Sequence, residues 1–536
     1  MRSILQMIIV GCVLLMPSIL NAAEKPNVVF ILADDLGIGD VKCFGGDKCQ
    51  IPTPNFDRIA NEGEKFTDAH PDVSHCIPTR MALMTGRHPW RFAAPKESGP
   101  WAFLTPRFST ERFTLGQLMQ NAGYRTGYVG KWHLGTVMPT TDGKTQGPKN
   151  VDYTKPLIIS PNDYGFDETF ILPGSLDMFP YVFAKNGVFQ GQVTAQKGWS
   201  AFNRVGPAAE DFVDTKVLDT FSTEAEQFIA APQNKSQPFF LFVALTSPHT
   251  PVSPSKAFEG KSGLGIYGDF VHETDHCVGR VLDALDEAGL SDNTLVIATS
   301  DHGAAAYAGN IRKATPFQYR ELEQLGHYSG GGYRGFKFSI YEGGLRIPFV
   351  AKWPGMIPAG KECDELIGLV DLMATLAEIT GSEIPAGSGP DSISFLPLLE
   401  DPEIRGARKD LVLQSTHAFA VRQGKWKLAV CPGSGSAGRY GNLPKTEDAW
   451  KEAVSTFGKT PQKTDLFQAP FVQLFDLGND PGETQNLAAE NLEKVKGLIG
   501  VLNETIERGR VTPGPNLEND RPVDPLVRVP PFVLMK

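Results

Sequence analysis

Short, continuous apolar runs alternate with amphipathic stretches along most of this chain. Residues 27–33 read NVVFILA, a near-continuous apolar run rich in β-branched side chains, which predicts a strand covered on both faces. Similar runs lie at residues 126–130, 239–245 and 295–299. Helix-like stretches lie between them, at residues 56–62, 115–122, 215–230 and 270–288. This alternation predicts an α/β fold whose mostly parallel central sheet has helices on both faces.

Each of these predicted strands is followed by chemically active side chains. The pairs or triplets are Asp34-Asp35, Lys131-Trp132-His133, Ser247-Pro248-His249 and Asp301-His302. Ligands of such sheets bind at the carboxyl ends of the strands, so acids, a lysine and imidazoles are expected to gather at one edge. A single Asp after a strand often only caps a helix or a turn. Four such strand ends together favour a functional site.

The composition changes in the last third of the chain. Residues 382–390 are rich in Gly, Pro and Ser, which predicts a domain boundary near residues 385–410. Beyond it, hairpin-like spacing predicts short strands at 411–414, 418–422, 426–430 and 473–476, with a helix over 493–508. We therefore predict a catalytic domain over residues 24–390 and a smaller C-terminal α+β subdomain, with an antiparallel sheet and a helix, over 391–536. The Gly/Pro-rich loops 135–165 and 303–335 are expected to form walls for a substrate.

Residues 1–23 predict an export signal. Arg2 precedes an apolar run over residues 4–16, and the segment ends in the small residues Ala22 and Ala23. The run is shorter than the ~18 apolar residues that cross a bilayer, which favours a cleaved signal peptide over a transmembrane anchor. A lipobox-like sequence ending at Cys12 leaves lipidation as an alternative. The mature chain is expected to be secreted or periplasmic.

Charge and cysteine content narrow the possible partners. The formal net charge of −10 argues against a nucleic-acid binder. An anionic substrate would therefore need a local cluster of cations. Six cysteines follow the predicted signal, and Cys43 and Cys49 are close enough in sequence to form a disulfide in an exported protein.

Four sequence motifs give these residues a context. Cys76, Pro78 and Arg80 form C-x-P-x-R, followed by the L-x-T-G-R sequence of residues 83–87. The other motifs are GKWHLG at 130–135, RGFK at 334–337 before YEGG at 341–344, and FDL at 475–477 before NDPGE at 479–483. Together they resemble the type I formylglycine-dependent sulfatases of the alkaline phosphatase superfamily, over residues 27–487. Thr79 stands where Ser or Ala is commonest in that family.

The resemblance implies a covalent mechanism. Cys76 would be oxidised to formylglycine (3-oxoalanine) by a separate maturation enzyme, and the hydrated aldehyde would supply the hydroxyl that attacks sulfur. By the same resemblance, Arg80 supports that group and the two lysines, Lys131 and Lys337, hold sulfate oxygens. His133 would act as the base that releases sulfate, and His249 would protonate the leaving oxygen.

The converging acids predict a metal ion. Asp34, Asp35 and Asp301 would repel one another without a cation, and oxygen ligands favour Ca²⁺, with Mg²⁺ second. The resemblance adds Cys76 and His302 to the metal site, although His302 stands where Asn is frequent and imidazole is a poor partner for calcium. Residues 174–181 are a candidate substrate loop, in which Asp177 would accept hydrogen bonds from sugar hydroxyls.

The sequence thus favours an exported sulfatase that hydrolyses a sulfate ester, with a sulfated carbohydrate as the favoured substrate. Two alternatives remain open. Phosphatases or phosphodiesterases of the same superfamily use Ser or Thr with histidine-rich zinc sites. An unmodified, calcium-containing chain would only bind a sulfated glycan. A polysaccharide fragment, a sugar monomer and an aryl sulfate all remain possible substrates.

Overall fold

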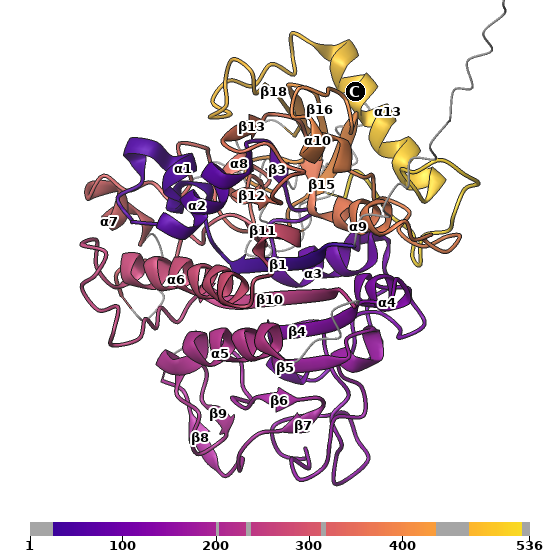
Figure 1. The fold of residues 1–536 in the computed structure, drawn as a ribbon. Helices are drawn as coiled ribbons and strands as arrows, with labels where there is room; N and C mark the ends of the chain where they lie inside the picture. Colours follow the sequence, from indigo (N-terminus) through magenta and orange to yellow (C-terminus); the bar gives the residue numbers. More distant parts are fainter. Residues whose placement is uncertain are drawn as a thin grey trace, which may run out of the picture.

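The computed structural model describes residues 25–199, 203–231, 237–311, 318–416, 418–435 and 471–527. Within these ranges a ten-stranded sheet forms the centre of the molecule (Figure 1). Its strands, in spatial order, are β13 (Lys361–Cys363), β2 (Glu64–Phe66), β12 (Phe349–Lys352), β11 (Thr294–Ser300), β1 (Asn27–Asp34), β10 (Phe239–Pro248), β4 (Arg125–Lys131), β5 (Glu168–Leu172), β6 (Ala184–Lys185) and β7 (Val188–Phe189). Strands β11, β1, β10, β4 and β5 run parallel, so their carboxyl ends meet at one edge.

Strand β1 lies in the middle of the sheet. Val29 on β1 is in register with Leu241 on β10 and with Val296 on β11. Every residue of β1 is buried, because helices cover both faces of a parallel sheet and leave no polar side to the strand. Because β1 lies in the centre of the sheet, its end is a rigid support for the residues that follow it.

Helices pack on the sheet in two groups. The long helices α5 (Val217–Ala230) and α6 (Ile266–Glu287) pack on each other and on β10, and α2 (Pro54–Glu62) packs on α6. Figure 1 shows α5 and α6 in front of β10 and β4. A second group consists of α3 (Cys76–Thr85), α4 (Leu115–Asn121) and α9 (Leu372–Thr380), which pack against one another. Shorter elements are α1 (Lys42–Gly45), α7 (Tyr319–Gln324), α8 (Glu342–Leu345), α10 (Leu396–Glu400), and the small strand pairs β3 (Ala69–His70) with β14 (Ile367–Gly368) and β8 (Ala195–Lys197) with β9 (Gly206–Ala208).

The C-terminal part contains a separate antiparallel sheet. Its four strands are β15 (Asp410–Gln414), β16 (Phe419–Gln423), β17 (Trp426–Ala429) and β18 (Gln473–Asp476). Helix α13 (Leu492–Arg508) packs on this sheet and buries Leu498 and Leu502, and a left-handed Gly509 ends it. Figure 1 shows this unit above the central sheet.

The fold class predicted from the pattern is confirmed. Each predicted strand and helix overlaps the observed element, with ends that differ by a few residues. The pattern missed β2, β12 and β13 at one side of the sheet, which have only three or four residues each and are too short to show a period. The division at residues 385–410 stays a prediction, and the proposed signal, with Cys12, lies outside the described residues.

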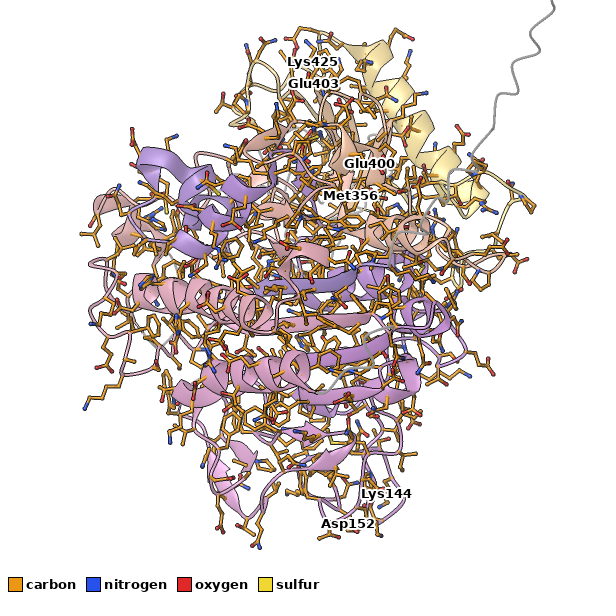
Figure 2. All side chains as sticks on the ribbon, in the orientation of Figure 1. Lys144, Asp152, Met356, Glu400, Glu403 and Lys425 are labelled. Atoms are coloured by element: carbon orange, nitrogen blue, oxygen red, sulfur yellow. The ribbon has the colours of Figure 1, made fainter. Side chains whose placement is uncertain are left out.

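Two other predictions concern cysteines and loops. A Cys43–Cys49 disulfide is wrong: both thiols are free, with Cys49 buried and donating to the carbonyl oxygen of Ile51. Loop 135–165 carries Lys144 and Asp152, which Figure 2 shows at the opposite end of the molecule from Lys425. The role of this loop as a substrate wall stays a prediction. Among the described helices, none has the length and apolar content needed to cross a membrane.

Candidate active site

The site begins where β1 ends. Asp34 is the last residue of the strand, and Asp35 follows with a left-handed backbone, at φ 65°. Asp adopts this conformation more readily than most residues, and such strained positions concentrate at functional sites. The reversal lets two consecutive carboxylates reach one centre. Both side chains are buried.

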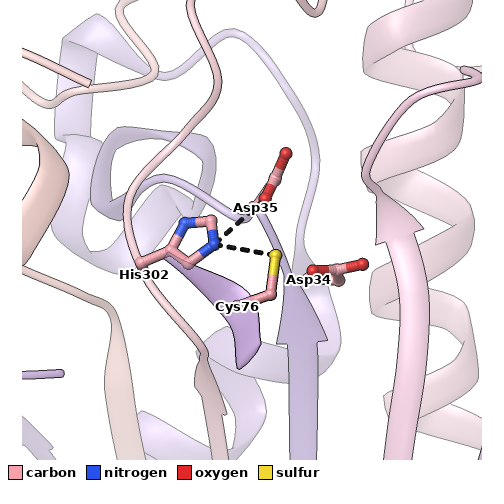
Figure 3. A group of neighbouring side chains, drawn as sticks. All are labelled: Asp34, Asp35, Cys76 and His302. Carbon is pink, nitrogen blue, oxygen red and sulfur yellow. Dashed lines mark hydrogen bonds and ion pairs between the residues drawn. The ribbon is translucent and has the colours of Figure 1, made fainter. Parts of the chain in front are cut away.

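The nucleophile candidate lies at a helix start. Cys76 is the first residue of α3, so its side chain lies at the positive end of the helix dipole. Its thiol donates to Nε2 of His302 at 3.2 Å, and Nζ of Lys337 donates to Sγ at 3.4 Å. Figure 3 shows Cys76 between Asp34 and His302, with Asp35 above them. Burial raises the pKa of the Cys76 thiol, so the unmodified cysteine is protonated.

Each acid of the site pairs with its own cation. Nζ of Lys131 donates to Asp34 at 2.5 Å, and Nζ of Lys337 donates to Asp35 at 2.7 Å. The guanidinium of Arg80 donates to Asp301 at 3.1 Å and also to the carbonyl oxygen of Lys131. These three contacts join β1, α3, β4, the end of β11 and the loop before α8.

The pairing sets the charges of these groups. Burial alone would raise the pKa of Asp34, but Lys131, His249 and Arg80 outweigh burial and hold this pKa well below its ordinary value. Burial would likewise lower the pKa of Lys337, whereas Asp35 keeps this pKa well above its usual range. Asp34 and Asp35 are therefore carboxylates, and Lys131 and Lys337 ammonium groups, at neutral pH.

The three histidines of the site differ in their partners. His302 donates through Nδ1 to the carbonyl oxygen of Gly303, which leaves the lone pair of Nε2 facing the thiol and Asp35. His249 donates through Nδ1 to Thr250, and its Nε2 lies 3.9 Å from Asp35. His133 has a left-handed backbone, and neither of its ring nitrogens has a hydrogen-bond partner in the described part of the chain.

His133 is a neutral imidazole in a buried, cationic environment. It is buried, and burial together with the charges of Lys131 and Arg80 lowers its pKa well below the ordinary value. The imidazole is therefore neutral at physiological pH, and its two ring nitrogens are not committed to a described neighbour.

The arrangement fits a divalent cation. Atoms of Asp34, Asp35, Cys76 and His302 lie within 4.8 Å of one another, and Oδ1 of Asp301 lies 3.5 Å from Nε2 of His302. Oδ1 of Asp34 and Oδ2 of Asp35 are buried and lack a hydrogen-bond partner among the described residues. Buried polar atoms without partners are costly, so oxygens of this kind favour a bound ion.

All ten residues predicted for the site converge in the structure. Sequence reasoning missed Tyr307, whose ring centroid lies 5.9 Å from Nζ of Lys337. It also gave no role to His75, the residue before Cys76, whose pKa is lowered to about 3 by burial and by Lys337. Only a position next to Cys76 could have drawn attention to His75. Asp177, five residues after the end of β5, accepts from Arg204 at 2.8 Å.

The fold and the site together define an α/β protein with acids, lysines and a buried cysteine at the carboxyl edge of its sheet. The sulfatase family model matches residues 26–382. N-acetylgalactosamine-6-O-sulfatase of Bacteroides thetaiotaomicron is 31% identical over 531 residues, covering 91% of this chain and 94% of the relative. Human steryl-sulfatase is 31% identical and covers 91% of this chain and 88% of its own.

A solved structure gives the same result. A Bacteroides thetaiotaomicron protein, described as a 6S-sulfatase in the metabolism of multiple glycosaminoglycans, superposes with a TM-score of 0.74 at 30% identity. The match covers 90% of this chain and 99% of that chain. The chain belongs to the sulfatase family, within the alkaline phosphatase superfamily, and is a sulfuric ester hydrolase. This assignment overrides the phosphatase alternative.

Proposed function

We propose that this sulfatase removes sulfate from a sulfated carbohydrate, with Cys76 converted to formylglycine and with Ca²⁺ held by Asp34, Asp35, Asp301 and His302. The observation that carries the proposal is the position of Cys76. It lies at the start of α3, with Lys337 and His302 in contact with its sulfur and three buried acid–cation pairs around it. The names of the bacterial relatives, which refer to an amino sugar and to glycosaminoglycans, favour a glycan over a sterol.

Each side chain has a place in the reaction. Formylglycine, when hydrated, supplies the hydroxyl that attacks sulfur, and Ca²⁺ supplies positive charge to the sulfate oxygens. Lys131 and Lys337 hold those oxygens, because both ammonium groups are fixed by buried acids and point into the same centre. Arg80 orients Asp301 and the end of β4.

Proton transfer is divided between two histidines. His133, which is neutral and has no hydrogen-bond partner among the described residues, accepts a proton when the sulfated enzyme releases sulfate. His249 stands on the other side of Asp35, and its Nε2 faces the centre because Nδ1 donates to Thr250. His249 would protonate the leaving oxygen of the sugar from Nε2, which requires a second ring proton beside the one that Nδ1 donates to Thr250.

Maturation and export complete the proposal. A separate maturation enzyme would oxidise Cys76, since the chemistry removes sulfur and two hydrogens from the side chain and adds one oxygen. The N-terminal segment would direct the chain to the periplasm or the exterior.

Mass spectrometry and kinetics test this function together. The tryptic peptide with Cys76 from active enzyme should have the lower mass of the aldehyde, and a panel of sulfated sugars and aryl sulfates should identify a sugar as the better substrate. Cys76→Ala should abolish turnover. Cys277→Ala, at a buried thiol on α6 outside the site, is the matched control and should retain turnover. An active enzyme with only unmodified Cys76 would refute the mechanism.

A further inference from the structure

Residues 334–343 form the loop that carries Lys337. The tip of this loop, at Lys337 and Phe338, is hydrogen-bonded to segments of the active site. The backbone N–H of Lys337 donates to the carbonyl oxygen of Ala304 at 2.8 Å, and the N–H of Phe338 donates to Ser74 at 2.7 Å. Ala304 follows the end of β11, and Ser74 precedes Cys76. The tip therefore binds the two segments that bring Asp301 and Cys76 to the site.

A single residue of the C-terminal part contacts both ends of this loop. The carbonyl oxygen of Glu483 accepts from the guanidinium of Arg334 at 2.9 Å, and its carboxylate accepts from the N–H of Glu342 at 2.6 Å. The loop also closes on itself, because the N–H of Gly343 donates to the carbonyl oxygen of Arg334 at 2.7 Å. Glu483 thus contacts Arg334 at the start of the loop and Glu342 near its end.

A buried lysine strengthens this connection. Nζ of Lys427, on β17, lies 2.8 Å from Glu342 and 2.9 Å from Glu483. All three side chains are fully buried. Glu483 also has a left-handed backbone, with φ 53°, a conformation that costs free energy in a residue other than glycine and persists where surrounding contacts fix it. The turn after β18 is therefore held against the loop by charge as well as by hydrogen bonds.

We infer that Glu483 is a positioning residue for Lys337: it fixes both ends of loop 334–343 and thereby holds the sulfate-binding ammonium group beside Asp35 and Cys76. The inference rests on the proposed role of Lys337. Catalytic groups need to be held within about 0.5 Å of their productive geometry, and loops meet that demand only when neighbouring residues support them. The C-terminal NDPGE sequence then serves catalysis as well as folding.

The alternative is that Glu483 only stabilises the fold. A double-mutant cycle separates the two roles. Glu483→Ala should lower kcat/KM about 10-fold in the wild-type background, since small misplacements of a catalytic group can cost up to about 10². The same change should cost less than about 2-fold in a Lys337→Ala background, because there is then no ammonium group to position. Glu483→Gln, which retains an acceptor for the N–H of Glu342, should recover most of the activity.

Asp476→Asn is the matched control. Asp476 ends β18, just before the same turn, and accepts from Lys425 and Asn479; among the described residues its carboxylate has no hydrogen bond to loop 334–343. It should change kcat/KM little. Hydrogen exchange gives a readout that needs no substrate: the amides of Lys337, Phe338 and Gly343 should exchange faster in Glu483→Ala than in Asp476→Asn. Measurements are made well below the melting temperature, on matured enzyme.

Several outcomes would overturn the inference. If the loss of kcat/KM in the double mutant equals the product of the two single-mutant losses, Glu483 acts independently of Lys337. Equal effects of Glu483→Ala and Asp476→Asn would show a structural role alone, as would unchanged exchange in the loop. A wild-type protein that hydrolyses no sulfate ester would count against the proposed function instead, and the exchange experiment would then decide the loop contact by itself.

Discussion

Asp68→Asn should weaken the connection between the two sheets in a pH-dependent way. Asp68 precedes β3 and lies 2.7 Å from Arg346 and 2.8 Å from Arg422, the latter on β16 of the C-terminal sheet. Burial alone would raise the pKa of Asp68, but the two guanidinium groups outweigh it and hold the pKa at about 2, against an ordinary 3.8. Each tenfold difference in proton affinity is worth about 1.4 kcal/mol, so the ionised carboxylate contributes about 2.5 kcal/mol to stability.

The sign follows from the depressed pKa. The contribution is fully present above the unfolded value near 3.8 and is lost as the pH falls through about 2. At pH 7 the variant should lose about 3–5 kcal/mol in total, because Arg346 and Arg422 also keep buried charges without their partner. The pH-dependent part should begin to fall below about pH 4 and should be gone only below about pH 2.

Thermal unfolding of the wild type and the variant at a series of pH values measures this effect. The difference in melting temperature should be constant between pH 8 and pH 5 and should shrink below pH 4. Lys496→Ala, which removes an exposed ion pair with Glu493 on α13, is the control and should change the melting temperature little. A difference that stays constant at low pH, or a variant as stable as the wild type at pH 7, would refute the reasoning.

Three further predictions concern the site. Exhaustive chelation should lower both activity and melting temperature, with recovery by Ca²⁺; an unchanged rate in metal-free enzyme would exclude the metal. Lys131→Ala should lower kcat/KM by about 10², and an unchanged value would exclude its role at the sulfate. His249→Ala should reduce the hydrolysis of sugar sulfates far more than that of nitrophenyl sulfate, whose leaving group departs without a proton; equal losses would remove His249 from the role of general acid.

The central sheet could be predicted because its strands are long and apolar on both faces. Each residue from Asn27 to Asp34 is buried, so the pattern of β1 is almost uninterrupted. Short strands carry no such signal. The three-residue strand β2 pairs with β12 and β13 only through contacts between segments about 300 residues apart, which local pattern does not encode.

The residues of the site were predictable, and their mutual contacts were not. Strand ends and the family motifs located Asp34, Cys76, Lys131 and Lys337. The pairing of each lysine with one particular acid depends on side-chain geometry at the sheet edge. The role of Glu483 was not predicted either. A Pro-Gly turn in the sequence indicates only a structural role, and the contact between Glu483 and Glu342 joins residues 141 positions apart.

The charge balance of the site explains how a chain of net charge −10 attracts an anion. Three buried carboxylates, of Asp34, Asp35 and Asp301, face three cations, Lys131, Lys337 and Arg80. Their charges cancel, so these six side chains alone give a sulfate ester no net attraction. A divalent ion would give the centre a positive charge, and its field would act over short distances in a buried environment where screening by salt is weak. The metal would then determine substrate affinity as well as rate, and chelation should raise KM along with its effect on kcat.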